Sequence, residues 1–185
     1  VRGSTELFVC APDRDGLFAN VTAMLDRLHF SVMEARVLSS NDGKALDTFL
    51  LLEADNQKPA SPERAEELHQ RLQRALAQSA PIMPPRRSMS RHLKHFQMAP
   101  RIDFKQSNGR TQMALVCSDR PGLLAAVTQV MMTCEVRVHD ARIATFGERV
   151  EDFFQLTDRR NNPLSETQQQ RLWHALVERI GPSQE

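Results

Sequence analysis

Residues 119–128 read Asp-Arg-Pro-Gly-Leu-Leu-Ala-Ala-Val-Thr, a sharp turn followed by the start of an amphipathic helix. Residues 13–22 read Asp-Arg-Asp-Gly-Leu-Phe-Ala-Asn-Val-Thr, and seven of the ten paired positions hold the same residue. The two stretches lie 106 positions apart, and Ala35-Arg36 recurs at the same spacing as Ala141-Arg142. We infer that the chain contains two copies of one structural module.

The overall composition fits two small domains. The chain has 185 residues, of which 41% are hydrophobic and 25% charged, and two copies would leave about 80–90 residues for each. The formal net charge of +1 argues against a general nucleic-acid or membrane-surface binder. No apolar run approaches the roughly 20 residues of a membrane helix. The first residue is Val1 rather than Met, so we expect a fragment of a longer protein.

Three cysteines, Cys10, Cys117 and Cys134, have no CxxC spacing. An odd number of cysteines without such spacing is typical of reduced thiols rather than of disulfides or a zinc site. We therefore expect a cytoplasmic protein.

Apolar periodicity and turn residues predict the same order of elements, β-α-β-β-α-β, in each copy. The second copy has only four residues after Gly181, so it could lack its last strand. We expect an α+β fold of two ferredoxin-like domains, with a hairpin at Asn108-Gly109 between them. The expected boundaries are a first domain over 1–83, a basic linker over 84–96, the last strand of the first domain over 97–107, and a second domain over 108–185.

Residues near these boundaries predict specific strands and helix starts. Strands are expected over Glu6–Ala11, Phe30–Ser40, Lys44–Glu53, Arg101–Lys105 and Thr111–Cys117. Ser61 followed by Pro62 predicts the start of one helix, and Ser165 with Gln168 predicts a capping box at the start of another.

Two features of the middle strands can be tested by a structure. A two-residue loop at Asn41-Asp42 would place Arg36 opposite Asp47, and a turn centred on Gly147 would place Arg142 opposite Asp152, as cross-strand pairs in both hairpins. The apolar phase changes at Met33-Glu34 and again at His139-Asp140. Such a change predicts a β-bulge or a strand that is buried on both faces.

The sequence offers no motif for catalysis. No P-loop, nucleophile elbow, HExxH or phosphate-binding GxGxxG is present. His139-Asp140 spells a dipeptide used by metal phosphohydrolases, but it has no companion histidines, and a metal needs at least three ligands. We expect no catalytic residue, metal or cofactor in this chain.

The turn before the first helix of each copy is the candidate binding feature. Backbone N–H groups at a helix N-terminus favour an anion such as a carboxylate. Asp13 and Asp119 could cap those N–H groups or contact an ammonium group. The alternative, that this turn only begins a helix, remains open.

The residues of the two copies resemble the ACT domain, a small-molecule sensor that usually binds amino acids. The ordered stretches DRDGLFANVTAMLDR (13–27), DGKALDTFLLLE (42–53), HFQMAPRIDF (95–104), DRPGLLAAVTQV (119–130) and DARIATFGERVEDFFQLTD (140–158) are similar to the C-terminal tandem ACT region of one enzyme family. That family is the bacterial bifunctional uridylyltransferase/uridylyl-removing enzyme of the PII nitrogen-regulatory protein. The resemblance covers nearly the whole chain, and residues 141–154 are its most specific part.

The resemblance implies a regulatory rather than a catalytic role. The parent family adds UMP to PII when glutamine is scarce and removes it when glutamine is plentiful. The Mg-dependent nucleotidyltransferase domain and the HD-type hydrolase domain that do this would lie upstream, and this chain lacks both. The implied role of the chain is to bind L-glutamine and to control those two activities in nitrogen metabolism.

In ACT domains the ligand usually lies where the first turn of one copy meets the second strand of its partner. Carried over to this sequence, the turns nominate Asp13, Arg14, Gly16, Leu17 and Asn20, with Asp119, Arg120, Gly122, Leu123 and Leu124. The second strands nominate Met33, Glu34, Val138, His139 and Asp140. The first copy has Asp15 where the pattern prefers Pro, and Cys134-Glu135 stands where a Gly often precedes the second strand. These departures leave open that one of the two sites is degenerate.

Other functions remain as alternatives. The module could serve docking or dimerisation without a ligand, or it could sense a different amino acid. An RNA-recognition module shares this order of strands and helices, but it needs paired aromatic residues on its central strands. Phe8 and Phe104 are isolated and the chain has no Tyr, so we disfavour that function.

Overall fold

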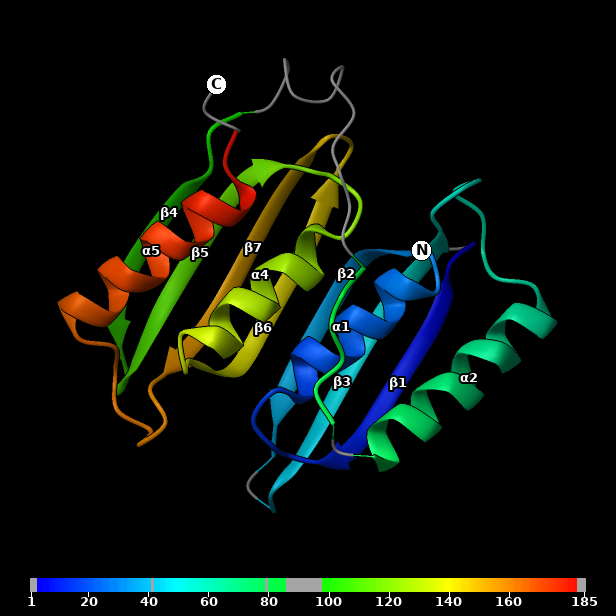
Figure 1. Ribbon diagram of the computed structural model, residues 1–185, viewed down its shortest axis with the longest axis horizontal. Coiled ribbons are helices and arrows are strands. Elements are labelled where there is room, and N and C mark those ends of the chain that lie inside the picture. Colours follow the sequence, from blue (N-terminus) through cyan, green and yellow to red (C-terminus); the bar gives the residue numbers. More distant parts are fainter. Residues whose placement is uncertain (1–2, 41, 79, 86–97, 183–185) are drawn as a thin grey trace.

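Helices cover one face of an antiparallel sheet in the computed structural model (Figure 1), which describes residues 3–40, 42–78, 80–85 and 98–182. Within these ranges the sheet has seven strands. The elements are β1 (Thr5–Pro12), α1 (Leu17–Arg27), β2 (Phe30–Ser39), β3 (Lys44–Glu53), α2 (Pro62–Ala77), β4 (Arg101–Ser107), β5 (Arg110–Ser118), α4 (Leu123–Thr133), β6 (Arg137–Phe146), β7 (Arg149–Thr157) and α5 (Glu166–Ile180). The linker expected over 84–96 lies, from residue 86 on, outside the described residues.

The strand order is β1-β3-β2-β6-β7-β5-β4, so the two copies share one continuous sheet. The first copy contributes β1, β3 and β2, and the second contributes β6, β7 and β5. The second strands of the two copies, β2 and β6, pair with each other along the middle of the sheet. This arrangement confirms the α+β fold with two ferredoxin-like units in tandem.

One strand lies in a different place from the one expected. We assigned residues 97–107 to the first copy, but β4 pairs with β5 at the far edge of the second copy, while β1 lies at the opposite edge of the sheet. That assignment is wrong, and the second copy does not lack its outer strand. The cause is local: Asn108 and Gly109 both have positive φ, 51° and 72°. A two-residue turn of this kind folds a strand back onto its neighbour, here β4 onto β5.

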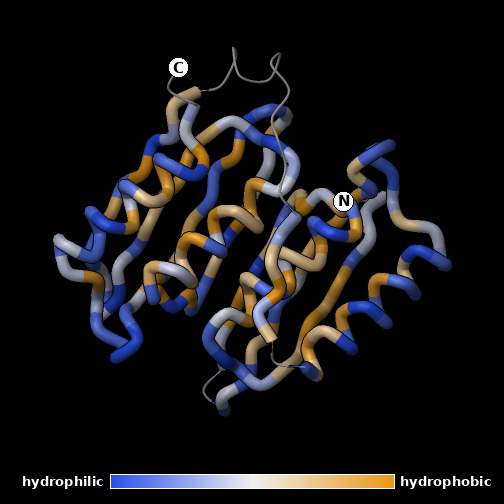
Figure 2. Tube along the Cα trace, in the orientation of Figure 1, coloured by the Kyte–Doolittle hydropathy of each residue, from blue (hydrophilic) through white to orange (hydrophobic). Residues whose placement is uncertain are grey.

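The hydrophobic core lies between the helices and the sheet. Leu17, Val21 and Leu25 of α1 are buried, and Leu172 and Leu176 of α5 are buried in the second copy. Figure 2 shows hydrophobic residues along the strands and helices and hydrophilic residues gathered in the connections at the ends of the sheet. The Ser61 side chain accepts a hydrogen bond from the Arg64 N–H, and the Ser165 capping box is present, so both expected helix starts are confirmed.

The expected Arg–Asp pairs of the two hairpins are wrong. Arg36 lies opposite Thr48, and Arg142 lies opposite Phe153, one position away from the expected partner in each case. A shift of one residue moves a side chain to the other face of a sheet. Arg36 and Arg142 are therefore exposed, while Asp47 is buried on the helix-covered face.

The lengths of the two hairpin loops explain the shift. The N–H of Ser40 donates to the Lys44 carbonyl, so three residues separate the ends of the first hairpin. In the second hairpin Phe146 pairs with Arg149, and only Gly147 and Glu148 lie between them. We had expected a two-residue loop in the first hairpin and a turn centred on Gly147 in the second.

Each second strand contains a bulge at the position where the apolar phase changes. The pairing of β2 with β3 shifts between Val32 and Glu34, and the pairing of β6 with β7 shifts between Val138 and Asp140. Met33 and His139 are the extra residues. The prediction of a bulge at these two places is confirmed.

Candidate functional site

The two copies are related by a local twofold arrangement. Arg36 pairs with Arg142 where β2 meets β6, and the hydroxyl oxygens of Thr22 on α1 and Thr128 on α4 lie 2.8 Å apart. Helices α1 and α4 lie side by side over this seam (Figure 1). The turn that begins the first helix of each copy consequently faces the second strand of the other copy.

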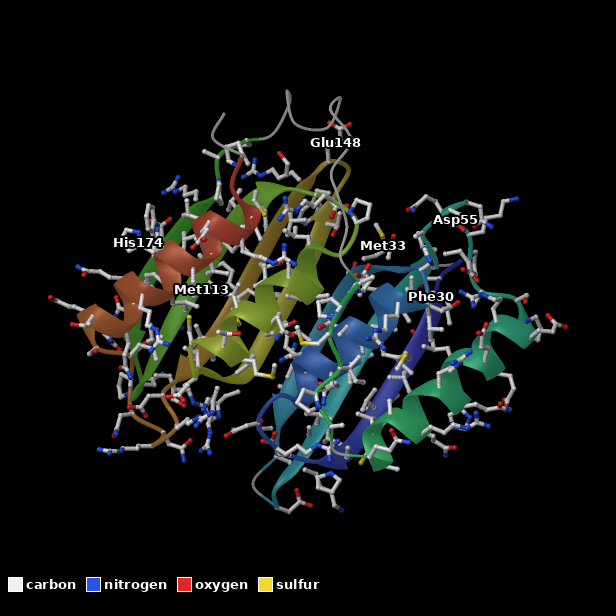
Figure 3. All side chains as sticks on the ribbon, viewed as in Figure 1. Phe30, Met33, Asp55, Met113, Glu148 and His174 are labelled. Carbon is white, nitrogen blue, oxygen red and sulfur yellow. The ribbon has the colours of Figure 1, made fainter. Side chains whose placement is uncertain are left out.

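The first cavity, which we call the Gly122 pocket, has a volume of about 330 Å³. It lies between the turn over residues 119–125 of the second copy and residues 29–33 of the first, with Asp152 among its lining residues. Figure 3 shows Met33 and Glu148 near the same end of the sheet, and both line this cavity. The volume is in the range of small-molecule sites.

The second cavity, the Gly16 pocket, has a volume of about 460 Å³. It lies between the turn over residues 13–19 of the first copy and residues 136–139 of the second, with Asp47 among its lining residues. Each pocket is therefore built from both copies. The arrangement expected for an ACT ligand site occurs twice.

Most of the nominated residues line one of these two pockets. Those in the Gly16 pocket are Asp13, Arg14, Gly16, Leu17, Val138 and His139. Those in the Gly122 pocket are Met33, Asp119, Arg120, Gly122, Leu123 and Leu124. Their contact with a ligand stays a prediction.

Three nominated residues, Asn20, Glu34 and Asp140, line neither pocket. The Asn20 side chain is buried and serves the fold, because its Oδ1 accepts from the Ile82 N–H at 2.8 Å and its Nδ2 donates to the Ala80 carbonyl at 3.3 Å. Glu34 and Asp140 come directly after the bulged residues. The bulge turns Met33 and His139, rather than the residues after them, toward the cavities.

Asp13 and Asp119 do not cap their helices, so of the two roles considered for them only contact with an ammonium group stays a prediction. Gly16 and Gly122 occupy the N-cap positions with φ of 81° and 74°, and neither helix has a side-chain cap. The Asp119 side chain instead accepts from the Arg120 N–H at 2.8 Å. Glycine adopts this left-handed conformation without steric cost. The N–H groups of the first helical turn have no partner within the helix and point out of its end.

Arg14 and Arg120 connect the turns to the helices that end nearby. The Arg14 guanidinium donates to the Leu76 carbonyl at 2.8 Å, and the Arg120 guanidinium donates to the Arg179 carbonyl at 2.9 Å. These carbonyls belong to the last turns of α2 and α5, where a cation is favourable. Both arginines therefore have a scaffolding role whether or not a ligand is present.

Two buried carboxyl groups in the pockets were not nominated from the sequence. Asp47 and Asp152 are each 1% exposed. Among the described residues, no hydrogen bond to Asp47 meets ordinary distance and angle limits, although the Leu38 N–H lies close enough to offset part of the rise that burial causes in the pKa of this carboxyl group. At the equivalent place the Asp152 Oδ1 accepts from the Ala144 N–H at 3.4 Å. Burial raises the pKa of Asp47 to about 7 and that of Asp152 to about 8. The sequence did contain a signal for these two residues. Each one is an aspartate on the otherwise apolar face of a strand, and the pattern is repeated in both copies.

His139, the bulged residue of β6, lines the Gly16 pocket. One ring nitrogen lies 2.6 Å from the Thr157 hydroxyl, and burial lowers the pKa of the imidazole. Among the described residues no group of three His, Cys, Asp or Glu side chains is placed to hold a metal ion. The half-buried side chain of His139 therefore lines the pocket without binding a metal ion among the described residues.

The two pockets differ at the junction between turn and strand. Asp15 and Arg137 form a bidentate ion pair in the Gly16 pocket, with N–O distances of 2.7 and 3.2 Å. The equivalent positions of the Gly122 pocket hold Pro121 and Ser31, which cannot form an ion pair. The Gly16 pocket therefore carries charges that the Gly122 pocket lacks.

Relatives among known proteins match the chain over nearly its whole length. It is 46% identical, over 96% of its residues, to the bifunctional uridylyltransferase/uridylyl-removing enzyme of Xanthomonas euvesicatoria pv. vesicatoria. It is 38% identical, over 98% of its residues, to the enzyme of the same name from Vibrio campbellii. The chain is a homologue of one part of this enzyme. It spans about a fifth of the length of these uridylyltransferase/uridylyl-removing enzymes, 20% and 21%.

Two further comparisons, with protein-family models and with solved structures, had different outcomes. No protein-family model matches the chain. Part of the aspartate kinase from Synechocystis has the same fold, with a TM-score of 0.53 and 14% identity, over 97% of this chain and 28% of the kinase. At this identity the likeness shows the fold alone, the α+β arrangement of two units over one sheet. No helix in the described part of the chain is long and apolar enough to cross a membrane.

Proposed function

We propose that the chain is an amino-acid-sensing regulatory module that binds L-glutamine. In this proposal it controls the uridylyltransferase and uridylyl-removing activities of its parent enzyme on PII. The observation that carries the proposal is the pair of cavities in which the first turn of one copy faces the second strand of the other. A ligand in such a cavity contacts both copies, so its binding is coupled to how the copies are arranged.

The chemistry of each pocket suits an amino acid. N–H groups at the start of α1 or α4 would bind the ligand carboxylate. The bulges at Met33 and His139 interrupt the ladder between strands, and a bulged residue leaves backbone groups unpaired. A glutamine side chain needs one donor and one acceptor for its amide, and a strand with free backbone groups offers both.

Regulation follows from differential affinity. Glutamine shifts the module between two arrangements only if it binds one of them more tightly. We propose that these arrangements differ in how the module contacts the nucleotidyltransferase and HD domains, which hold the Mg-dependent chemistry in the parent. The module itself would then need no cofactor.

A docking role without a ligand is the second candidate, because the sheet face opposite the helices exposes large apolar side chains. Phe8 is 64% exposed, Phe146 63% and Phe153 54%. Such residues on an uncovered sheet face are typical of contact surfaces. This face could contact neighbouring domains or a second copy of the chain, as in a homodimer.

A calorimetric titration of the chain with L-glutamine separates these candidates, with L-glutamate and D-glutamine as controls. Saturable heat for L-glutamine alone supports the sensor. Saturable heat for another amino acid would keep the sensor and change its ligand. The absence of heat for every amino acid at millimolar concentration would contradict the sensor and favour docking.

Two matched variants assign the heat to a pocket. Met33→Trp would fill the Gly122 pocket, and His139→Trp would fill the Gly16 pocket. Both residues are partly exposed bulge residues, so a larger side chain should not disrupt the core. We expect each variant to remove the binding that depends on its own pocket and to leave the other pocket unchanged.

A further inference from the structure

Asp47 and Asp152 occupy equivalent places on the helix-facing side of the sheet. On β3 the buried positions are Ala45, Asp47, Phe49 and Leu51, so one carboxyl group interrupts an apolar face. Strand β7 repeats this arrangement, with Asp152 between buried Val150 and Phe154. A buried carboxyl group with few or no hydrogen bonds is unfavourable for the fold: in the described part of the chain Asp47 has none within ordinary limits, and Asp152 has one at 3.4 Å from the Ala144 N–H. The presence of such a group in both copies needs another explanation.

Besides burial, the charges that shift the pKa of each carboxyl group are negative. Asp13 on the loop after β1 raises the pKa of Asp47, and Asp119 on the equivalent loop raises that of Asp152. Cys117 on β5 also lies near Asp152. The other ionisable side chains of the Gly16 pocket are Arg14, Asp15, Arg110, Arg137 and His139, and those of the Gly122 pocket are Asp26, His29, Arg120 and Glu148.

Three of the four arginines in the pockets are engaged elsewhere, and Arg110 is the fourth. Arg137 binds Asp15, while Arg14 and Arg120 donate to helix-end carbonyls. None of the ion pairs among the described residues includes Asp47 or Asp152. Each pocket thus presents a buried acidic group and a helix N-terminus, which together match the ammonium and carboxylate ends of a zwitterion.

We propose that Asp47 and Asp152 are the proton-exchanging acceptors of the two pockets: each holds a proton while its pocket is empty and releases it to solvent when the ammonium group of an amino acid docks against the carboxylate. This inference rests on the proposed function and adds the residues and the proton linkage to it. The only bond broken is the O–H bond of the carboxyl group, and its proton leaves to solvent when a ligand binds.

The raised pKa values set the pH range of the exchange. Near pH 6 both carboxyl groups are protonated in the empty pockets, because their pKa values are about 7 and about 8. An ammonium group at the carboxylate favours its ionised form. Binding should therefore tighten as pH rises from 6 to 8, by up to about tenfold per pH unit, and should level off above the pKa of the empty pocket.

The test is calorimetry of L-glutamine binding to the chain at pH 6.5, in two buffers whose protonation enthalpies differ. The difference in observed heat counts the protons released. We expect close to one proton released per L-glutamine bound at pH 6.5 and clearly less at pH 8, where more of each empty carboxyl group is already ionised and the ligand still carries its ammonium proton. Binding with equal heats in both buffers would overturn the proton exchange while leaving the sensor function intact, and no binding by any amino acid would overturn both.

Isosteric variants assign the proton to its source. Asp47→Asn and Asp152→Asn each remove one acceptor, and both should fold because the replaced group is already neutral in the empty protein. Each should abolish proton release from its own pocket and flatten the pH dependence of affinity there. The matched control is Asp103→Asn, the same substitution at an exposed position of β4, where the Asp103 side chain is 62% exposed. This variant should bind L-glutamine and release protons as the wild type does. Proton release that persists in the Asp47→Asn, Asp152→Asn double variant would overturn the assignment.

Discussion

The hydroxyl groups of Thr22 and Thr128 meet at 2.8 Å, and the two residues occupy the same position in the two copies of the module. The local twofold axis that relates the copies therefore runs between their first helices, and it also runs between Arg36 and Arg142 on the sheet. The two pockets lie on either side of this seam. A change at either pocket must consequently act on a contact that both copies share.

The threonine contact should show measurable energetic coupling. Both side chains are buried, and a hydrogen bond of this kind contributes about 1 kcal/mol. Thr22→Val and Thr128→Val should each lower the free energy of unfolding by about that amount, while the double variant should lose less than the sum because both single changes break the same bond. Urea unfolding of the four proteins measures this coupling. Strict additivity would show that the two hydroxyl groups do not interact.

The buried carboxyl groups predict a pH-dependent stability. Their folded-state pKa values, about 7 and about 8, lie above the ordinary value of 3.8. The folded state therefore holds more protons than the unfolded state, and its stabilisation is complete below pH 4 and is lost as pH rises toward 8. The free energy of unfolding should fall over this range, at up to about 1.4 kcal/mol per pH unit for each carboxyl group.

The Asn variants provide the control for that prediction. Asp47→Asn together with Asp152→Asn should flatten the fall in stability between pH 5 and pH 8, so that the variant is the more stable protein at pH 8. Thermal unfolding across this range measures it. An unchanged pH profile in the double variant would mean that both carboxyl groups are already ionised in the folded protein.

Much of the fold could be predicted from the sequence because its signals are local. The repeat, the bulges at Met33 and His139, and the capping box at Ser165 each depend on a few neighbouring residues. The hairpin at Asn108-Gly109, which pairs β4 with β5, was predicted from its turn residues and is confirmed. The assignment of β4 to the first copy was wrong, because a strand between two copies can complete the sheet of either one. The register of the hairpins failed for a related reason: one residue more or less in a loop reverses the face of every following side chain.

The resemblance predicted part of the candidate site but not all of its residues. The turns and second strands were identified, and the structure brings them together across the two copies. Asp47 and Asp152 were missed as pocket residues because the expected register paired them with Arg36 and Arg142. Asn20 was misjudged because its partners, the backbone at Ala80 and Ile82, lie about 60 residues away, where no local pattern indicates them.

The ion pair of the Gly16 pocket predicts a difference in affinity between the two pockets. The Asp15 carboxylate lies at the turn where the ligand carboxylate would bind, so the like charges repel. Asp15→Asn removes this charge and leaves Arg137 available to attract the ligand. L-glutamine should then bind the Gly16 pocket several-fold more tightly, as seen by calorimetry of the Met33→Trp background, in which the Gly122 pocket is filled.

Stability should hardly respond to the same change. The Asp15–Arg137 pair is 51% and 33% exposed at its two side chains, and such pairs contribute less than about 1 kcal/mol. Urea unfolding of Asp15→Asn checks this.

The binding experiment on the same variant has an outcome that would contradict the repulsion argument. Weaker binding of L-glutamine at the Gly16 pocket would indicate that the ion pair holds the turn in its binding-competent position.

The two N-cap glycines should tolerate substitution unequally. An Ala in the left-handed conformation of either residue is strained by about 1–2 kcal/mol. At Gly122 the added methyl group would also lie 2.8 Å from an oxygen of the buried Asp26, whereas at Gly16 it would lie 3.0 Å from the sulfur of Met132. A methionine side chain adjusts more readily than a buried carboxylate. Gly122→Ala should therefore lower the free energy of unfolding by at least about 1 kcal/mol more than Gly16→Ala, as measured by urea unfolding, and equal losses would show that Asp26 moves as freely as Met132.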